Sequence, residues 1–187
     1  MSFNIPFDRS WYVGYWQDAS VANRGVTGIE RAFRKPIDDA RSTLQGQGLN
    51  GSRTCAIHVR RGDLLALARE GKAVFYDLAF YEACIAFVRS RLGAVQFLVF
   101  SDDVPWCRAS FGGISGIHFA NDFSISGAIE EMAAMACCSS HIFSNSTFGW
   151  WGARLAAHPA LCVFPKQWGG LQHAAQFRFE DRVQIQI

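Results

Sequence analysis

From Thr54 onward, short apolar runs alternate with segments whose apolar residues recur at helical spacing. The run 54–60 is rich in β-branched residues, and the run 95–100 is continuously apolar, as in strands buried on both faces. A weaker strand is expected at 116–119, and further strands at 141–144 and 161–164. The spacing predicts helices at 77–92, 126–137 and 148–157, where Asp77 and Ser126 are candidate N-caps and Gly93 is a natural stop.

Repeated alternation of strand and helix predicts an α/β fold, with a Rossmann-like, mostly parallel sheet and flanking helices. Ligands of such sheets bind beyond the carboxyl ends of the strands. The polar residues that follow the predicted strands should therefore converge on one rim. They are Arg60–Asp63, Ser101–Asp103, Asn121–Asp122 and Ser144–Thr147.

Residues 1–50 differ in character from the rest of the chain. They contain the turn signals Asn23, Gly25 and Gly28, a short predicted helix at 38–44, and a Gly/Gln-rich stretch at 45–51 that is typical of a loop or linker. We expect residues 51–187 to form the Rossmann-like domain.

Composition is that of a folded domain with a substantial core. Of the 187 residues, 50% are hydrophobic and 18% are charged, which argues against disorder. A net charge of +2, without a long basic stripe, argues against a nucleic-acid surface. The six cysteines are scattered and form no CxxC pair, so buried, reduced thiols are expected and zinc is not.

The segment His58–Asp63 (HVRRGD) is the first candidate for chemistry. In a strand, His58 and Arg60 point to one side and Arg61 to the other. Guanidinium groups at a strand end suit a pyrophosphate, because arginine binds phosphate oxygens bidentately and keeps its charge. We favour this role for Arg60. For Arg61 a scaffold salt bridge is an equal alternative, and His58 taken alone is more typical of a core histidine.

A second candidate is the segment 143–153 (FSNSTFGWWGA), where small hydroxyl residues join a strand to a helix. Free N–H groups at a helix N-terminus form an anion site, and Ser146 or Thr147 can also act as an N-cap. Gly149 and Gly152 lower helix propensity, which suggests that a backbone or a ligand approaches closely. The tandem Trp150 and Trp151 are more typical of packing than of substrate stacking.

Two acidic pairs complete the set. Glu130 and Glu131 fall in the first turn of a predicted helix, where a carboxylate either interacts with the helix dipole or accepts paired hydrogen bonds from guanine. Asp102 and Asp103 follow the most apolar strand and could contact a ribose, cap the next helix or hold Arg61. We favour these roles over a metal site, since no further carboxylate lies close in sequence.

These segments resemble the motifs of a known family. His58–Asp63 resembles the HxRRxD motif of the α-1,2-, α-1,6- and protein O-fucosyltransferases. Segments 100–103 and 145–153, with GYWQ at 14–17 and PKQW at 165–168, resemble further motifs of the α-1,2 branch. Five motifs in the right order cover the chain from about Trp11 to Trp168.

The resemblance implies the donor-binding half of a GT-B fold that uses GDP-fucose. It implies transfer of L-fucose, with inversion, to the 2-hydroxyl of a galactoside glycan, without a metal or other cofactor. The residues that it implicates comprise Arg60 and Asp63 in catalysis, and His58, Arg60, Arg61, Asp102, Glu131, Asn145, Ser146 and Thr147 in GDP-fucose binding. Within this set, Arg60 and Thr147 would hold phosphate, and Glu131 stands where the family usually has a guanine-reading Asp.

The sequence departs from the family at its start, where the glycine-rich GGLGNQ-type segment is absent. We therefore expect residues 1–50 to be a remnant of the acceptor-side domain and a linker. The alternative to an enzyme is a truncated module that binds GDP or GDP-fucose without catalysis. No apolar stretch is long enough to span a bilayer, so a cytoplasmic chain is expected, with peripheral membrane contact permitted by aromatic residues at 11–16.

Overall fold

The computed structural model describes residues 19–157, 161–165 and 184–186. Its centre is a six-stranded sheet in the order β3-β2-β1-β4-β5-β6. Every neighbouring pair of strands runs parallel. The strands are β1 (Thr54–Val59), β2 (Gln96–Ser101), β3 (Ile117–Phe119), β4 (Ser140–Phe143), β5 (Leu161–Phe164) and β6 (Gln184–Gln186). The predicted α/β class with a parallel sheet is confirmed.

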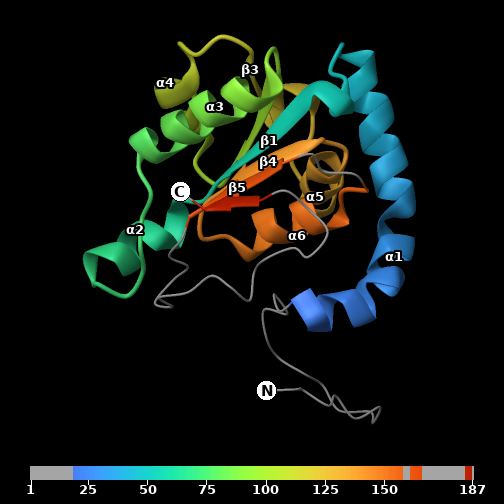
Figure 1. Cartoon of the computed structure of the whole chain (residues 1–187), viewed down its shortest axis with the longest axis horizontal. Coiled ribbons are helices and arrows are strands. Elements are labelled where there is room, and N and C mark those ends of the chain that lie inside the picture. Colours follow the sequence, from blue (N-terminus) through green and yellow to red (C-terminus); the bar gives the residue numbers. More distant parts are fainter. Residues whose placement is uncertain (1–18, 158–160, 166–183, 187) are drawn as a thin grey trace.

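Helices cover both faces of the sheet (Figure 1). One face packs against α3 and α4, and the other against α1, α5 and α6, while α2 lies beyond the end of β1. The helices are α1 (Ala19–Gly46), α2 (Gly62–Arg69), α3 (Leu78–Leu92), α4 (Val104–Phe111), α5 (Ala128–Ala136) and α6 (Thr147–Leu155). The described residues also form two short 3-10 helices, η1 (Gly51–Arg53) and η2 (Ala120–Phe123).

The central strands are buried along their length, as their apolar sequences predict. All six residues of β1 and all four of β4 are buried. Alternate residues of β1 enter the two cores: Ile57 packs with the α3 side and Ala56 with the α1 and α5 side. This alternation decides which way the polar residues beyond the strand will point.

Helix α1 is much longer than the predicted helix at 38–44. It spans 28 residues and contains Pro36. Its apolar residues Phe33, Ile37, Ala40 and Leu44 pack in one cluster with residues of α5 and the sheet. Burial of this face outweighs the turn signals Asn23, Gly25 and Gly28 and the helix-breaking tendency of Pro36.

Part of the segment 1–50 thus shares a core with the sheet, since Leu44 and Leu49 are almost fully buried beside Leu98. The assignment of residues 1–50 to an acceptor-side remnant and linker stays a prediction.

Local signals at the helix ends are confirmed in part. Asp77 caps α3 by accepting from the Phe80 N–H, and Gly93 ends that helix with a φ of 70°. Ser126 does not cap α5, because the helix begins one residue later than that cap requires: Gly127 is its N-cap, without a side-chain hydrogen bond. The eight-residue helices α2 and α4 were not predicted.

The six cysteines are free, and all except the half-buried Cys137 are buried. Burial raises the pKa of the Cys84 thiol to about 12 and that of Cys107 to about 11. Such thiols stay protonated near neutral pH and are poor nucleophiles. The prediction of buried, reduced cysteines is confirmed, with Cys137 only half-buried.

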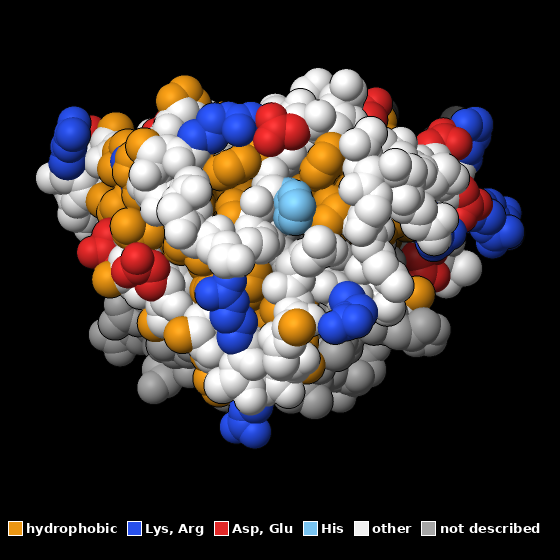
Figure 2. Space-filling model, turned by 90° about the horizontal axis from the view of Figure 1, so that it is seen from above, with side chains coloured by type: hydrophobic (Ala, Val, Ile, Leu, Met, Phe, Trp, Pro, Cys, Tyr) orange, Lys and Arg blue, Asp and Glu red, His pale blue; other side chains and the backbone are white. Residues whose placement is uncertain are grey.

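Charged side chains are dispersed on the face seen in Figure 2, where Lys and Arg lie singly or beside Asp and Glu. This dispersion agrees with the small net charge of +2. Among the described residues, no helix is long and apolar enough to cross a lipid bilayer.

Candidate functional site

The strand order places a topological switch point between β1 and β4. From β1 the chain winds outward to β2 and β3, and from β4 it winds the other way to β5 and β6. In sheets of this order, ligands bind in the crevice where the winding reverses, at the carboxyl ends of the strands. The loops there are those that follow β1 and β4, which carry the two main polar motifs. His58 and Phe143 are register partners at this end.

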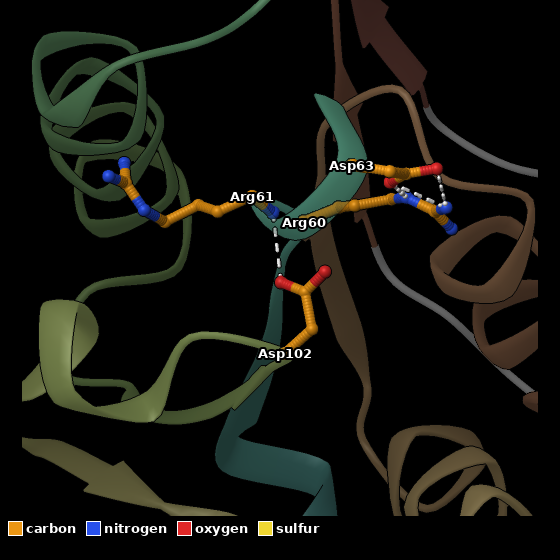
Figure 3. Close-up of polar contacts among 4 residues, drawn as sticks. All are labelled: Arg60, Arg61, Asp63 and Asp102. Atoms are coloured by element: carbon orange, nitrogen blue, oxygen red, sulfur yellow. Dashed lines mark hydrogen bonds and ion pairs between the residues drawn. The ribbon is translucent and has the colours of Figure 1, made fainter. Parts of the chain in front are cut away.

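Arg60 lies on the α5 and α6 side of the sheet and reaches the surface. Its side chain is 34% exposed and is bound bidentately by Asp63 (Figure 3). Nε donates to Oδ1 at 3.0 Å, and Nη2 donates to Oδ1 and Oδ2 at 2.8 Å each. The hydrogen bond from Arg60 holds the pKa of Asp63 below its usual range. Asp63 is therefore an ionised partner of Arg60 and a weak proton acceptor.

Arg61 points to the opposite side, toward the α3 and α4 layer (Figure 3). Its Nε donates to Asp103 Oδ2 at 3.0 Å, and the side chain is 12% exposed. The guanidinium carbon lies 3.7 Å from the centroid of the Trp106 ring and 5.3 Å from that of Phe75. Of the two roles left open for Arg61, this geometry favours the scaffold role, and of the acidic pair after β2 it is Asp103 that binds the side chain.

The acidic pair after β2 is divided between two tasks. Asp103 binds Arg61 and also caps α4 by accepting from the Trp106 N–H at 3.1 Å. Asp102 is exposed and accepts from the backbone N–H of Arg61 at 2.9 Å. A Cβ at Gly62 would lie 2.7 Å from Asp102 Oδ2, so the turn after Arg61 requires glycine while that carboxylate stays in place. Ribose contact by Asp102 stays a prediction.

His58 is buried at the centre of the rim. It is 8% exposed, and its ring centroid lies 5.4 Å from that of Phe148. Burial, and secondarily the Arg60 charge, lower its pKa to about 3. Among the described residues, His58 Nδ1 has no hydrogen-bond partner. A neutral imidazole beside Arg60 is therefore available as a hydrogen-bonding group, but not as a cation.

The loop between β4 and α6 is compact and buried. Ser146 is the N-cap of α6 and accepts from the Gly149 N–H at 3.1 Å, which confirms one of the two predicted capping roles. Thr147 is the first residue of the helix and is half-buried. Asn145 Nδ2 donates to the Val74 carbonyl at 2.9 Å, which ties this loop to the segment between α2 and α3.

Close backbone approach at the two glycines of α6 is confirmed. A Cβ at Gly149 would lie 2.9 Å from Phe143 Cβ and 3.1 Å from His58 Cβ, and one at Gly152 would lie 2.9 Å from Met135 Cβ. Glycine thus lets α6 lie against β1, β4 and α5. Trp150 is fully buried, as expected for a packing residue.

Glu131 lies in the first turn of α5 and is half-buried. Burial raises its pKa, with additional contributions from the nearby Asp102 and Glu130 carboxylates. Glu130 is exposed, and its carboxylate lies over Gly127. Of the two carboxylates, Glu131 is thus the more buried.

The structure thus gathers His58, Arg60, Asp63 and the start of α6 at the switch point, with Asp102 and Glu131 farther along the same edge. Arg61 is turned away from this group. Sequence reasoning missed Phe75 and Trp106 as partners of Arg61. A helix-start signal, Asp103 followed by Pro105, could have located Trp106, but no local signal marks Phe75.

Within the described residues, no three His, Cys, Asp or Glu side chains come together as a metal site. The expectation that the chemistry needs no metal or other cofactor stays a prediction. The GYWQ segment at 14–17, the aromatic residues at 11–16 and most of the PKQW segment lie outside the described residues.

Comparison with known proteins gives one family match that spans almost the whole chain. The family described as "Glycosyl transferase family 11" matches residues 2–184. An O-antigen biosynthesis glycosyltransferase, WbnK, of Escherichia coli is 30% identical over 119 residues, which are 62% of this chain and 39% of that protein. Galactoside alpha-(1,2)-fucosyltransferase 2 of Bos taurus is 32% identical over 124 residues, 64% of this chain and 36% of that protein.

The aligned part thus amounts to between a third and two fifths of the length of these relatives. Among solved structures, POFUT1 in complex with GDP superposes with a TM-score of 0.49 and 14% identity, covering 73% of this chain and 48% of that one.

Proposed function

This chain belongs to glycosyl transferase family 11, and we propose on that premise that it transfers L-fucose from GDP-fucose to a galactoside. In the proposed reaction the 2-hydroxyl of the galactose attacks the anomeric carbon with inversion. GDP leaves, and the hydroxyl proton passes to a base. The second candidate is a GDP- or GDP-fucose-binding module without catalysis, which is favoured by the short aligned share of the curated relatives.

The proposal rests on one observation: a cationic side chain and the positive end of a helix dipole lie at the same switch point. Arg60 follows β1, and the N-terminus of α6, capped by Ser146, follows the adjacent strand β4. A guanidinium and a helix N-terminus both attract a diphosphate. We assign contact with the β-phosphate to Arg60 and Thr147. Asn145 and Ser146, from the same loop, are proposed as further contacts to GDP-fucose.

These groups would act mainly on the leaving group. As the bond to fucose breaks, negative charge grows on the departing GDP, and cationic groups fixed in advance lower the barrier most. Arg60 is fixed by its bidentate contact with Asp63. Asp63 has a lowered pKa because of that contact, so we assign it to holding Arg60 and leave the general base unassigned.

The nucleobase end of the site would extend along the rim toward α5. Guanine offers an N1–H and an amino group on one edge, and a carboxylate can accept from both. We propose Glu131 for this task, Asp102 for a ribose hydroxyl and His58 as a neutral contact near the nucleotide. The cytoplasmic location and peripheral membrane contact remain proposals from sequence alone.

The first test is calorimetric titration of the purified chain with GDP, and with UDP and ADP as controls. Selective binding of GDP is expected. Equal binding of all three nucleotides, or of none, would contradict the proposal. Release of GDP from GDP-fucose on addition of a galactoside then separates the enzyme from the binding module, since the module binds but does not release.

Arg60→Ala provides the matched mutational test. Loss of a charged contact to phosphate should weaken GDP binding by about ten- to a hundredfold, corresponding to about 1.5–3 kcal/mol. Transfer should fall by about two to three orders of magnitude. Arg108→Ala is the control, because Arg108 is an exposed arginine that pairs with Asp122, a residue that follows β3, two strands away from β1 in the sheet. Near-normal turnover of Arg60→Ala would refute the leaving-group role.

A further inference from the structure

We infer that Arg61 is a positioning residue that holds the segment between α2 and α3 against the donor site, and that it does not contact the diphosphate. This inference rests on the proposed function for the identity of the donor. The segment comprises residues 70–77 and is called here the bridging segment. It joins the end of α2 to the N-cap of α3.

The surroundings of the Arg61 guanidinium support this role. The guanidinium carbon lies 3.7 Å from the centroid of the Trp106 ring and 5.3 Å from that of Phe75, and Asp103 accepts from Nε at 3.0 Å. Stacking on aromatic rings covers the faces of the Arg61 guanidinium and leaves little of it accessible to a ligand, unlike the more exposed guanidinium of Arg60. The Arg61 side chain is only 12% exposed and leaves the strand on the face opposite to Arg60.

The bridging segment has a second attachment, on the other side of the switch point. The Val74 carbonyl accepts from Asn145 Nδ2 at 2.9 Å, and Asn145 belongs to the buried loop that leads to Ser146 and Thr147. Val74 and Phe75 are consecutive residues. Arg61, which follows β1, holds Phe75, and Asn145, which follows β4, holds Val74. Because Arg61 also binds Asp103 after β2, the bridging segment links the ends of all three strands.

The ends of the bridging segment are also defined. Gly71 has a φ of 70°, and Lys72 N–H donates to the Leu67 carbonyl at 2.8 Å, which closes α2 with a Schellman-type turn. Asp77 opens α3 as its N-cap. The part between these two points contacts the rest of the rim through Phe75 and Val74, so release of Phe75 should loosen the Asn145 loop.

A phosphate contact and a positioning role predict different results for charge-conserving and ring-removing variants. If Arg61 acts by stacking, Arg61→Lys should behave like Arg61→Ala, because lysine keeps the charge but loses the planar group. Both should weaken GDP binding about tenfold, and Phe75→Leu should do the same. The Arg61→Ala and Phe75→Leu effects should not multiply in the double variant, since the second change removes a contact already lost.

Calorimetry of these four variants with GDP tests the inference, after thermal unfolding has established that each is folded. Arg108→Ala is the control, since it removes an arginine that also pairs with an aspartate and lies 4.6 Å from a ring centroid, that of Phe119, but is exposed. Its GDP affinity should be unchanged. Retention of near-normal affinity in Arg61→Lys, with a large loss in Arg61→Ala and none in Phe75→Leu, would overturn the inference and indicate direct phosphate contact.

Hydrogen exchange of the nucleotide-free chain gives a readout that does not depend on the donor. Arg61→Lys should speed exchange of the amides at 72–77 and at 144–147, while Arg108→Ala should not. If the wild-type chain fails to bind GDP, the proposed function fails, but this exchange pattern still decides the positioning role. Unchanged exchange at both segments in Arg61→Lys would refute it.

Discussion

At the scale of single residues, Arg60 and Arg61 have the same side chain and very different surroundings. Successive residues at a strand end point to opposite faces of the sheet. Arg60 therefore meets solvent and Asp63, whereas Arg61 enters a contact with Trp106 and Asp103. The burial of one guanidinium and the exposure of the other separate the scaffold contacts of Arg61 from the phosphate contact proposed for Arg60, within a single dipeptide.

The adjacent Glu130 and Glu131 make a similar pair, and they yield a prediction. Glu131→Gln should weaken GDP binding about ten- to a hundredfold, because an amide cannot accept two hydrogen bonds from guanine, and a hydrogen bond to a charged group contributes about 1.5–3 kcal/mol. UDP binding should not change. Calorimetry with both nucleotides measures the ratio.

Glu130→Gln is the matched control, since Glu130 is exposed and lies over Gly127. The raised pKa of Glu131 adds a pH test. Its carboxylate should be protonated at a higher pH than an ordinary glutamate, so wild-type GDP affinity should begin to fall earlier on acidification than affinity measured for Glu131→Gln. Equal GDP affinity in Glu131→Gln and wild type would exclude Glu131 as the guanine contact.

At the scale of elements, the unit formed by β4, its loop and α6 depends on close packing of a helix against the sheet. Trp150 is fully buried on this helix, while Gly149 and Gly152 allow its backbone to approach the neighbouring elements. Ser146 supplies the cap. The same packing that stabilises the unit holds the helix N-terminus beside Arg60.

Gly149→Ala should therefore destabilise the protein, although alanine favours helix. The new Cβ would meet Phe143 Cβ at 2.9 Å and His58 Cβ at 3.1 Å, atoms that cannot rotate away. Overpacking of this kind costs about 1–3 kcal/mol, more than the roughly 1 kcal/mol gained in helix propensity. Urea unfolding measures the difference.

Gly28→Ala in α1 is the control, and it should raise the stability of the protein rather than lower it. No atom lies within 4 Å of a Cβ at Gly28, so only the propensity gain of up to about 1 kcal/mol should be seen there. A stabilised Gly149→Ala variant would contradict the close packing of α6.

At the scale of the whole molecule, the sheet buries residues on two faces, and α1 closes one of them. Leu44 is 1% exposed and packs in the same cluster as Ala56 and Leu98 of the central strands. The C-terminal part of α1 thus packs into the same core, so weakening its contacts should lower the stability of the sheet as well.

Leu44→Ala should lower the free energy of unfolding by about 2–5 kcal/mol, the usual cost of such a cavity. Helix α1 and the sheet should unfold in one transition, seen by both far-ultraviolet circular dichroism and tryptophan fluorescence. Leu92→Ala is the control because Leu92 is 40% exposed, and it should change stability little. A separate early transition that leaves the fluorescence signal intact would mean that α1 folds independently of the sheet.

Much of this architecture could be predicted from local pattern. Strands β1 and β2 carry continuous apolar runs, and Asp77 and Gly93 mark the ends of α3 in the expected way. Helices α2 and α4 were missed because eight residues give little periodicity, and α1 was underestimated because its glycines and proline are outweighed by burial against α5. Propensity is local, whereas this burial depends on residues about a hundred positions away.

The sequence by itself determined the alternation of strand and helix, the positions of the polar residues after the strands, and membership of a family through ordered motifs. Only the tertiary structure decided that the chain winds in opposite directions from β1 and β4, which brings Arg60 beside the start of α6. It also decided that Arg61 stacks on Trp106 and Phe75. The physical reason is that strand order and side-chain burial arise from contacts between residues far apart in the chain, and no local pattern encodes them.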